Sequence, residues 1–515
     1  MKRTCLLLAV PAVLLVLSVL TPHVAADVKL PAVFADHMVL QRDAALPVWG
    51  WAEAGEKVEV SIAGQTKTAT ADANGKWSVK LDKLTAGEPT SMTVKGKNTI
   101  TIQDVLVGEV WLCSGQSNMA WTVASSKNFD QEKAAAQFPQ IRQFKESSGT
   151  ATTPQEKGGG NWTVCSPDTV GGFTATGYFF GREAHKALNV PVGLINSSVG
   201  GTPIEAWTSW DAQKDKAELK PIFERWDKQA AEWDRDPAAA QARYEKQVAA
   251  HKEAAAKAKA DGKPAPRAPQ KPSDPRLASH HPATLFNGKI APLIPYAIRG
   301  AIWYQGESNA GGGQLYELQL TTMIADWRTR WGQGDFPFGW VQLPNFHKAQ
   351  VAPVEHSGWV LVREGMLKAL RVPNTGMAIT VDIGEANDIH PKNKQDVGKR
   401  LASWALAKVY GQKVPASGPL PASNKINGNE VVITFQHTDG GLVGKGGELK
   451  GFAIAGADKK WARANAKIEG DKVIASSPDV TAPVAVRYAW ADNPDCNLYN
   501  GADFPASPFR TDDWR

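Results

Sequence analysis

The sequence has 515 residues, which is long for a single hydrophobic core, so we expect two or three domains. Apolar residues make up 43% and charged residues 21%, a globular composition that excludes a largely disordered chain. The formal net charge is +6 and falls to +4 without Lys2 and Arg3, which is too mild to predict a nucleic-acid or membrane partner.

Residues 1–26 have the pattern of an export signal. Lys2 and Arg3 precede an apolar run from Cys5 to Leu20, and Val24-Ala25-Ala26 resembles a small-residue cleavage site. The run is short and contains Pro11, which argues against a retained anchor. We therefore expect an exported protein, periplasmic or extracellular, with no membrane anchor after cleavage.

Three cysteines remain beyond the signal, and an oxidising compartment would permit one disulfide among them. Their spacing does not choose a pair among Cys113, Cys165 and Cys496. The sequence likewise leaves the oligomeric state open.

Residues 27–104 are predicted to form a small β domain. Short alternating runs such as KVEVSIAG are separated by turn signals, and Asn74-Gly75 predicts a hairpin between two of them.

The pattern changes at DVLVGEVWLCSGQSNM, an almost continuously apolar strand that ends in a glycine turn. Further strands are expected in VPVGLINSSVGG, IRGAIWYQGES, FPFGWVQLPNF and NTGMAITVDIG, with helices between several of them. This alternation predicts an α/β domain over residues 105–412, in which ligands bind at the carboxyl ends of the strands.

Two further segments complete the expected organisation. Residues 211–275 interrupt the α/β pattern with an Ala, Lys and Glu-rich run and a Pro-rich stretch, which predicts a helical insertion with a loose linker. Residues 413–515 return to short β-like runs and predict a second β domain.

Two strand ends carry almost the same tetrapeptide, GQSN with Ser117 and GESN with Ser308. A serine hydroxyl needs a base, a group that orients the base, and donors for the oxyanion. Neither turn has the GxSxG pattern of a nucleophile elbow. The charge of Glu307 beside Ser308 would oppose an oxyanion there, which favours Ser117 as the nucleophile.

His390, in EANDIHPKNK, is the best candidate for the base, because it follows a strand-like segment and Asp388 lies two residues before it. The alternative for His390 is the cap of a helix that starts near Pro391. His280, His281 and His347 are weaker candidates for substrate contacts. No spacing resembles a zinc site, so we expect no metal, and no cofactor is indicated.

Five segments together resemble the sialate O-acetylesterase family, within the SGNH hydrolases and close to the carbohydrate acetylesterases. They are SGQSNM, VGGTPIEAW, WYQGESNA, NDIHPKNK and NLYNGADFPASPFRTD. The resemblance implies a flavodoxin-like three-layer domain that hydrolyses acetyl esters on an O-acetylated carbohydrate.

The resemblance also implies residue roles. Ser117 would be the nucleophile, its amide and that of Gly200 or Gly201 would donate to the oxyanion, and Gln305 would be a side-chain donor. His390 would be the base, and the supporting or substrate-binding residues would be Asn118, Glu307 and Asn309.

One position departs from the pattern of many SGNH hydrolases, in which an aspartate precedes the histidine by three residues. Asn387 stands at that position, so the carboxylate that orients His390 is Asp388 or, alternatively, Asp382 or Glu385. If no carboxylate does so, Ser117 and His390 would work as a dyad in which a main-chain carbonyl holds the imidazole. Two functional alternatives also remain open: an acetylesterase of plant polysaccharides such as xylan or pectin, and a non-catalytic carbohydrate-binding protein. Trp121, Trp207 and Trp303 lie near the motifs, and burial is favoured over a role as sugar platforms.

Overall fold

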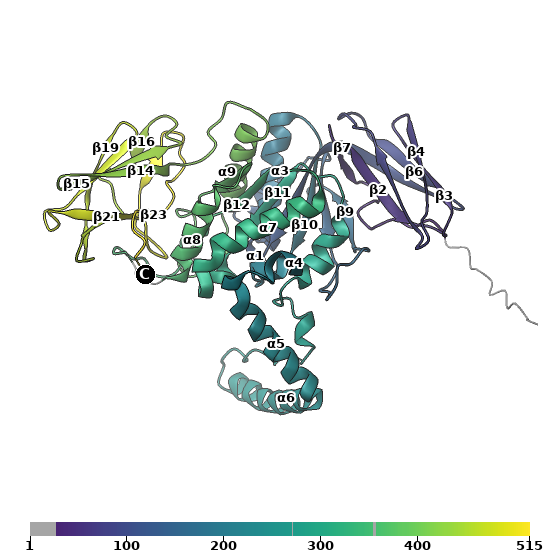
Figure 1. The fold of residues 1–515 in the computed structure, drawn as a ribbon, viewed down its shortest axis with the longest axis horizontal. Helices are drawn as coiled ribbons and strands as arrows, with labels where there is room; N and C mark the ends of the chain where they lie inside the picture. Colours follow the sequence, from purple (N-terminus) through teal and green to yellow (C-terminus); the bar gives the residue numbers. More distant parts are fainter. Residues whose placement is uncertain (1–26, 270, 354–356, 515) are drawn as a thin grey trace, which may run out of the picture.

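The structure is a computed structural model that describes residues 27–514 except 270 and 354–356. The expected export signal, residues 1–26, lies outside the described residues. A central α/β body is flanked by β-rich regions at its two ends, with the earlier residues at one end and the later residues at the other (Figure 1).

The body is built on a sheet whose strand order is β13-β12-β11-β7-β10-β8-β9. All neighbours pair in parallel except β8 and β9, which are antiparallel, so the sheet is mixed. The strands are β7 (Thr99–Gly115), β8 (Ile141–Glu146), β9 (Gly160–Val164), β10 (Val192–Ser198), β11 (Gly300–Tyr304), β12 (Phe338–Val341) and β13 (Thr375–Ala378). The expected α/β class is confirmed.

Helices cover both faces of this sheet because successive strand residues are apolar on both sides. Leu112 and Trp303 pack in one cluster with α7 (Tyr316–Trp331) and α8 (Gly358–Ala369). Their sequence neighbours Cys113 and Ile302 point to the other face. They pack in a second cluster with α3 (Ala175–Leu188) and α9 (Lys394–Lys408). Short helices are α1 (Ser117–Ala120), α2 (Phe129–Ala134) and α4 (Trp210–Gln213).

Strand β7 is shared between the body and the first β region. Its first part pairs with β6 (Thr90–Lys95), and its later part pairs with β10 and β11. Asp104 has a φ of 54°, an irregular backbone position near the change of partner. The boundary expected between residues 104 and 105 therefore falls inside one continuous strand. The side chains of β7 become buried near this point, which the sequence shows, but the strand keeps pairing with its neighbours on both sides of it.

The first β region contains β1 (Val39–Gln41), β2 (Leu46–Trp51), β3 (Lys57–Ile62), β4 (Gln65–Thr70) and β5 (Lys76–Leu81). The turn expected at Asn74-Gly75 is present, with a φ of 75° at Gly75. However, β4 pairs with β3 and β5 pairs with β2, so the turn is not a hairpin. Asp72 accepts hydrogen bonds from the amides of Asn74 and Lys76, which holds the chain in a corner between two sheets.

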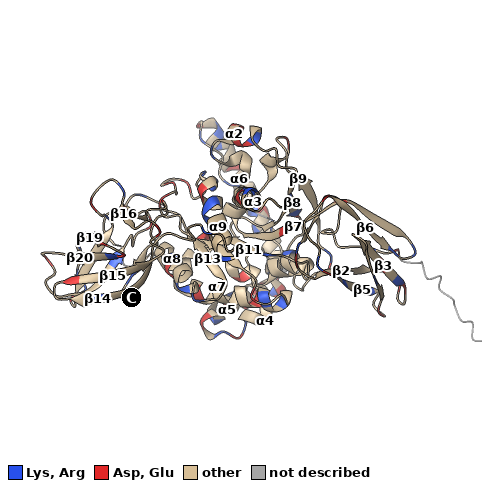
Figure 2. Ribbon diagram, turned by 90° about the horizontal axis from the view of Figure 1, so that it is seen from above, with Lys and Arg blue, Asp and Glu red and all other residues tan. Residues whose placement is uncertain are grey.

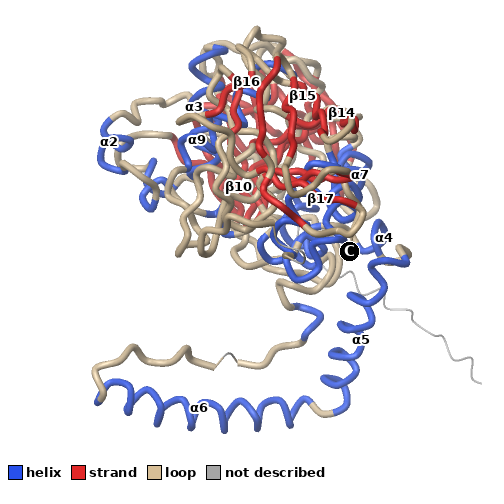
Figure 3. Tube along the Cα trace, turned by 90° about the vertical axis from the view of Figure 1, so that its left-hand side faces the viewer, coloured by secondary structure: helices blue, strands red, loops and turns tan. Residues whose placement is uncertain are grey.

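The insertion forms two helices, α5 (Lys220–Arg235) and α6 (Pro237–Ala260), which project away from the body (Figures 1 and 3). Asp236 joins them and caps α6 by accepting a hydrogen bond from the amide of Ala239. On the return segment, Arg276 forms an ion pair with Asp234 of α5.

The last β region follows α9 and contains two four-stranded sheets and a two-stranded one. Its strands are β14 (Leu420–Asn427), β15 (Glu430–Gln436), β16 (Leu442–Gly444), β17 (Phe452–Gly456), β18 (Trp461–Arg463), β19 (Asn465–Glu469), β20 (Lys472–Ser476), β21 (Pro483–Tyr488), β22 (Leu498–Asn500) and β23 (Phe509–Arg510).

Three global features bear on the expectations from sequence. Cys113, Cys165 and Cys496 are all unpaired. Basic and acidic residues are interspersed along the molecule (Figure 2). Within the described ranges, no helix combines the length and the apolar character that a bilayer span requires.

Candidate active site

The GQSN and GESN turns lie side by side because β7 and β11 are neighbouring parallel strands, with Gly115 opposite Tyr304. Each turn begins with a glycine at positive φ, 138° at Gly115 and 154° at Gly306. The Gln116 amide donates to the Tyr304 carbonyl at 3.0 Å, and the Gln116 side chain accepts a hydrogen bond from the Ser308 amide at 3.3 Å. The two turns therefore form one structure at the carboxyl edge of the sheet.

Ser117 is the first residue of α1 and is partly exposed. Gly200 lies against it, since a Cβ added to Gly200 would be 3.4 Å from the Ser117 Cβ. In the part of the chain that the structure describes, the amides of Ser117 and Gly200 have no hydrogen-bond acceptor. Gly201 differs from Gly200, because its φ of 72° makes it the residue that turns the chain. Ser117 and the glycine that packs against it therefore both have a backbone amide without an acceptor.

His390 reaches the same edge from the loop between β13 and α9. Its imidazole stacks on the Trp121 indole, with ring centroids 4.9 Å apart and planes 11° apart, and Trp121 directly follows α1. Partial burial lowers the pKa of His390 below its ordinary value, the Asp388 carboxylate raises it, and the Lys394 ammonium lowers it further. The net direction favours a neutral imidazole, the form that can accept a proton.

Helix α9 begins at Lys394 and is capped by Asn393, which accepts a hydrogen bond from the amide of Asp396. His390 and Pro391 therefore precede the helix, and the alternative that His390 caps it is wrong. The cause is local: the Asn393 side chain supplies the cap that a helix start requires.

Of the three candidate carboxylates, Asp388 is the one that contacts the imidazole. Its Oδ1 is 3.6 Å from His390 Nδ1, longer than an ordinary hydrogen bond, and accepts the backbone N–H of His390 at 2.8 Å. Asp382 forms an ion pair with Arg400 and accepts from the Tyr499 hydroxyl. Glu385 accepts the backbone N–H of Lys392. Both alternatives are thus engaged by other groups.

Gln305 is fully buried, and its side chain is already hydrogen-bonded on every side. Its Nε2 donates to the Thr202 carbonyl at 3.1 Å and to Asn309 Oδ1 at 2.7 Å, while its Oε1 accepts from the Tyr316 hydroxyl. Asn309 Oδ1 also accepts the amide N–H of Ile204. Gln305 and Asn309 therefore hold the loop that carries Gly200, and in this arrangement Gln305 has no N–H left for an oxyanion.

Asn118 and Glu307 contact each other beneath the two turns. Asn118 Nδ2 donates to Glu307 Oε1 at 2.5 Å, and Asn118 Oδ1 accepts from Lys394 Nζ at 2.7 Å. Burial raises the pKa of Glu307, and hydrogen bonding from Asn118 opposes that rise. Lys394 is a residue that the sequence analysis missed. A lysine at the first position of a helix, where cations are unfavourable, was the signal that could have identified it.

The tryptophans near the motifs differ in burial. Trp207 and Trp303 are fully buried, as expected, whereas Trp121 is partly exposed and forms the stack with His390. Among the described residues, no group of three or more potential metal-ligating side chains comes together.

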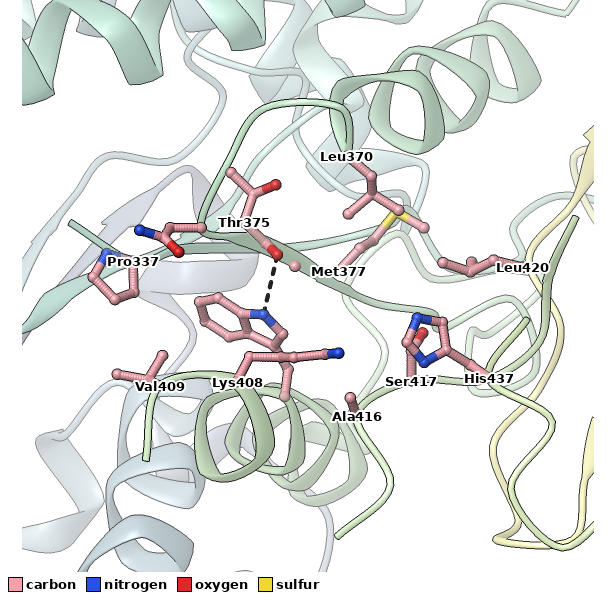
Figure 4. A pocket seen from close by; sticks show the side chains of 13 residues that line it. Pro337, Leu370, Thr375, Met377, Lys408, Val409, Ala416, Ser417, Leu420 and His437 are labelled. Atoms are coloured by element: carbon pink, nitrogen blue, oxygen red, sulfur yellow. Dashed lines mark hydrogen bonds between the residues drawn. The ribbon is translucent and has the colours of Figure 1, made fainter. Parts of the chain in front are cut away.

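A cavity of about 240 Å³ lies elsewhere in the fold (Figure 4). It is lined by Pro337 and Thr375, at the starts of β12 and β13, and by His437 of the last β region. Trp404, which also lines it, donates a hydrogen bond to the Thr375 carbonyl. Because the starts of parallel strands lie at the opposite edge from Ser117, this cavity is not part of the serine site.

Comparisons with known proteins agree with the motifs. The profile of a family described as "Carbohydrate esterase, sialic acid-specific acetylesterase" matches residues 107–258 and 287–407. Sialate O-acetylesterases of rat and human are each 29% identical to the chain. The alignments cover 92% of this chain in both cases, with 92% of the rat protein and 90% of the human protein.

A solved structure is also similar to the whole chain. It is described as a novel carbohydrate acetylesterase from Xanthomonas citri, is 38% identical, and superposes with a TM-score of 0.79 over 95% of this chain and all of the other. These relatives are enzymes, which overturns the alternative of a non-catalytic carbohydrate-binding protein. The chain belongs to the carbohydrate esterase family of sialic acid-specific acetylesterases and is a carboxylic ester hydrolase.

Proposed function

We propose that the protein is an exported serine esterase that removes O-acetyl groups from sugars through an acetyl-enzyme. The observation that supports this proposal is the placement of three features at one edge of the sheet: Ser117, the acceptor-free amides of Ser117 and Gly200, and His390 stacked on Trp121. Nucleophile, oxyanion donors and base are the groups that acyl transfer requires.

In the first step, the Ser117 oxygen attacks the acetyl carbonyl carbon while His390 takes the hydroxyl proton. The carbonyl oxygen becomes an oxyanion that accepts hydrogen bonds from the amides of Ser117 and Gly200. The bond to the sugar oxygen then breaks, and that oxygen takes the proton from His390. Gln305 contributes by holding the Gly200 loop, and it donates to the oxyanion only if it gives up Thr202 or Asn309.

In the second step, a water molecule attacks the acetyl-enzyme while His390 takes a proton from that water. The tetrahedral intermediate collapses, acetate leaves, and the Ser117 oxygen regains its proton. Asp388 orients and polarises His390 mainly by charge, since the contact between their side chains is 3.6 Å.

O-acetylated sialic acid is the first candidate substrate, because the family and the curated relatives carry that specificity in their descriptions. Acetylated xylan or pectin is the second, because the more similar bacterial neighbour is described only as a carbohydrate acetylesterase. Acetate release from the three substrates, compared by kcat/KM, distinguishes the two.

Helices on both faces of the sheet support a flavodoxin-like SGNH domain over residues 105–412, with β domains at 27–104 and 413–515. The basic, apolar and small-residue pattern of residues 1–26 supports export.

The test is hydrolysis of a chromogenic acetate ester and of O-acetylated sialic acid by wild type and Ser117→Ala. We expect the variant to fold and to lose turnover on both. Equal activity in wild type and variant would contradict the proposal.

A further inference from the structure

The backbone on either side of His390 accepts hydrogen bonds from two side chains, one at the GQSN turn and one at the start of α9. The carbonyl of Ile389 accepts a hydrogen bond from Asn118 Nδ2 at 3.0 Å, and the carbonyl of Pro391 accepts one from Lys394 Nζ. Asn118 is the residue after Ser117, so the same side chain that follows the nucleophile fixes the backbone next to the base.

Asn118 is fully buried and uses its whole amide in these contacts. Its Nδ2 serves Glu307 and Ile389, and its Oδ1 accepts from Lys394 at 2.7 Å. Three separate motifs therefore meet in it: the GQSN turn, the GESN turn and the HPKNK loop.

Lys394 is fully buried at the start of α9, where the helix dipole disfavours a cation. The ammonium faces the rings of Trp121, at 5.8 Å, and Tyr304, at 5.5 Å. A buried lysine at this end of a helix is costly unless partners hold it, which argues that its position serves a purpose.

We propose that Lys394, Asn118 and Glu307 form a buried positioning unit that fixes the His390 loop against the helix carrying Ser117. The proposal rests on the proposed function and deepens it, because it assigns Glu307 of the second turn and Lys394 to the positioning of the nucleophile and base. None of the three touches substrate; they act through Ser117 and His390.

The unit also sets the charge around His390. Burial lowers the pKa of Lys394 to about 7, while Glu307, Glu385 and Asp388 oppose that shift. The charged and titratable groups that act on the imidazole are Asp388, which raises the pKa of His390, and Lys394, which lowers it. Loss of the lysine charge therefore raises the pKa of His390 and makes the base harder to keep neutral.

The test compares Lys394→Met with Lys394→Met/Glu307→Gln and with Lys289→Met. Lys289 is a matched control, since it is also buried and forms an ion pair with Glu146. The readouts are kcat and KM across pH on a chromogenic acetate ester, and urea unfolding for each protein.

We expect Lys394→Met to lower kcat about 10²-fold with little change in KM, as for misplaced reacting groups. The acid limb of its pH profile should move to higher pH. The double variant also removes the Glu307 carboxylate, which Lys394→Met leaves without its cation. It should therefore be more stable than Lys394→Met but keep the shifted acid limb and the low kcat. Lys289→Met should lose stability without moving the limb.

An unmoved acid limb and near-normal kcat in the double variant would overturn the positioning unit, and so would an equal shift in Lys289→Met. The double variant decides the question if Lys394→Met does not fold. The proposed function fails separately, if Ser117→Ala keeps wild-type activity.

Discussion

The two turns at the ends of β7 and β11 share three of four residues but have different surroundings. Ser117 is followed by a buried asparagine and lies beside Gly200, whereas Ser308 is exposed and donates its backbone amide to Gln116. In the second turn the residues on either side of Ser308 make the contacts: the partly buried Glu307 binds Asn118, and the buried Asn309 binds the 202–204 loop. Similar tetrapeptides thus have different contacts, because the neighbouring chain differs, and we propose that the first turn is the reactive one and the second a supporting one.

Replacing each serine by alanine gives the largest contrast between the turns. We expect Ser117→Ala to lower kcat by about 10⁴-fold or more, since loss of a nucleophile removes the covalent route. Ser308→Ala should stay within about twofold of wild type, because its side chain is exposed and has no assigned role. Initial rates on an acetate ester measure both, and comparable losses would show that the turns are not distinct.

Gly200→Ala tests the oxyanion side of the first turn. The added methyl group would lie 3.4 Å from the Ser117 Cβ, so we expect a fall in kcat of about tenfold to 10²-fold from a small displacement. Thermal unfolding should change little.

Gly201→Ala is the matched control for that variant. Its added methyl group meets nothing within 4 Å, but the φ of 72° is unfavourable for alanine, so about 1 kcal/mol of stability should be lost. A larger kcat loss in Gly201→Ala than in Gly200→Ala would assign the oxyanion donor to the other glycine.

Gln305→Ala tests the supporting role of the second turn. Removal of the buried amide leaves the Thr202 carbonyl, Asn309 Oδ1 and the Tyr316 hydroxyl without this partner. We expect unfolding free energy to fall by about 1–3 kcal/mol, accompanied by lower kcat, because buried polar groups lose their bonds. Urea unfolding measures this. A variant with wild-type stability and a selective loss of kcat would instead indicate a direct oxyanion donor.

The smallest expected effect is a shift in pH profile. His390 must be neutral to accept a proton, so kcat/KM should be lost as pH falls through its pKa, which lies below the ordinary value of about 6.5. The Asp388 carboxylate raises that pKa, so Asp388→Asn should move the acid limb to lower pH. A pH–rate profile measures this, and a shift to higher pH would contradict the assignment of Asp388.

Some elements could be predicted from sequence because their signals are local. The strands β10 to β13 are short apolar runs, and burial on both faces requires such runs. Strand β8 was missed because Arg142 and Gln143 are polar although buried; Arg142 forms an ion pair with Asp104, and Gln143 accepts the amide N–H of Thr174. Tertiary partners, not periodicity, make that strand.

The site divides in the same way. Ser117 and His390 lie in recognisable motifs, so the sequence could nominate both as candidates. Gln305 donates to the Thr202 carbonyl, and Lys394 donates to the Asn118 side chain. In each pair the two residues are more than 100 positions apart in the chain. Such contacts carry no spacing signal, so sequence alone could not distinguish an oxyanion donor from a loop support.

The central claim is that Ser117 alone carries the acetyl group during turnover. Acid quenching of the wild-type enzyme during steady turnover, followed by peptide mass mapping, tests it directly. We expect an acetyl group on the peptide that contains Ser117 and none on the peptide that contains Ser308. An acetyl group on Ser308 would contradict the account, and so would a turnover rate in Ser117→Ala equal to that of the wild type.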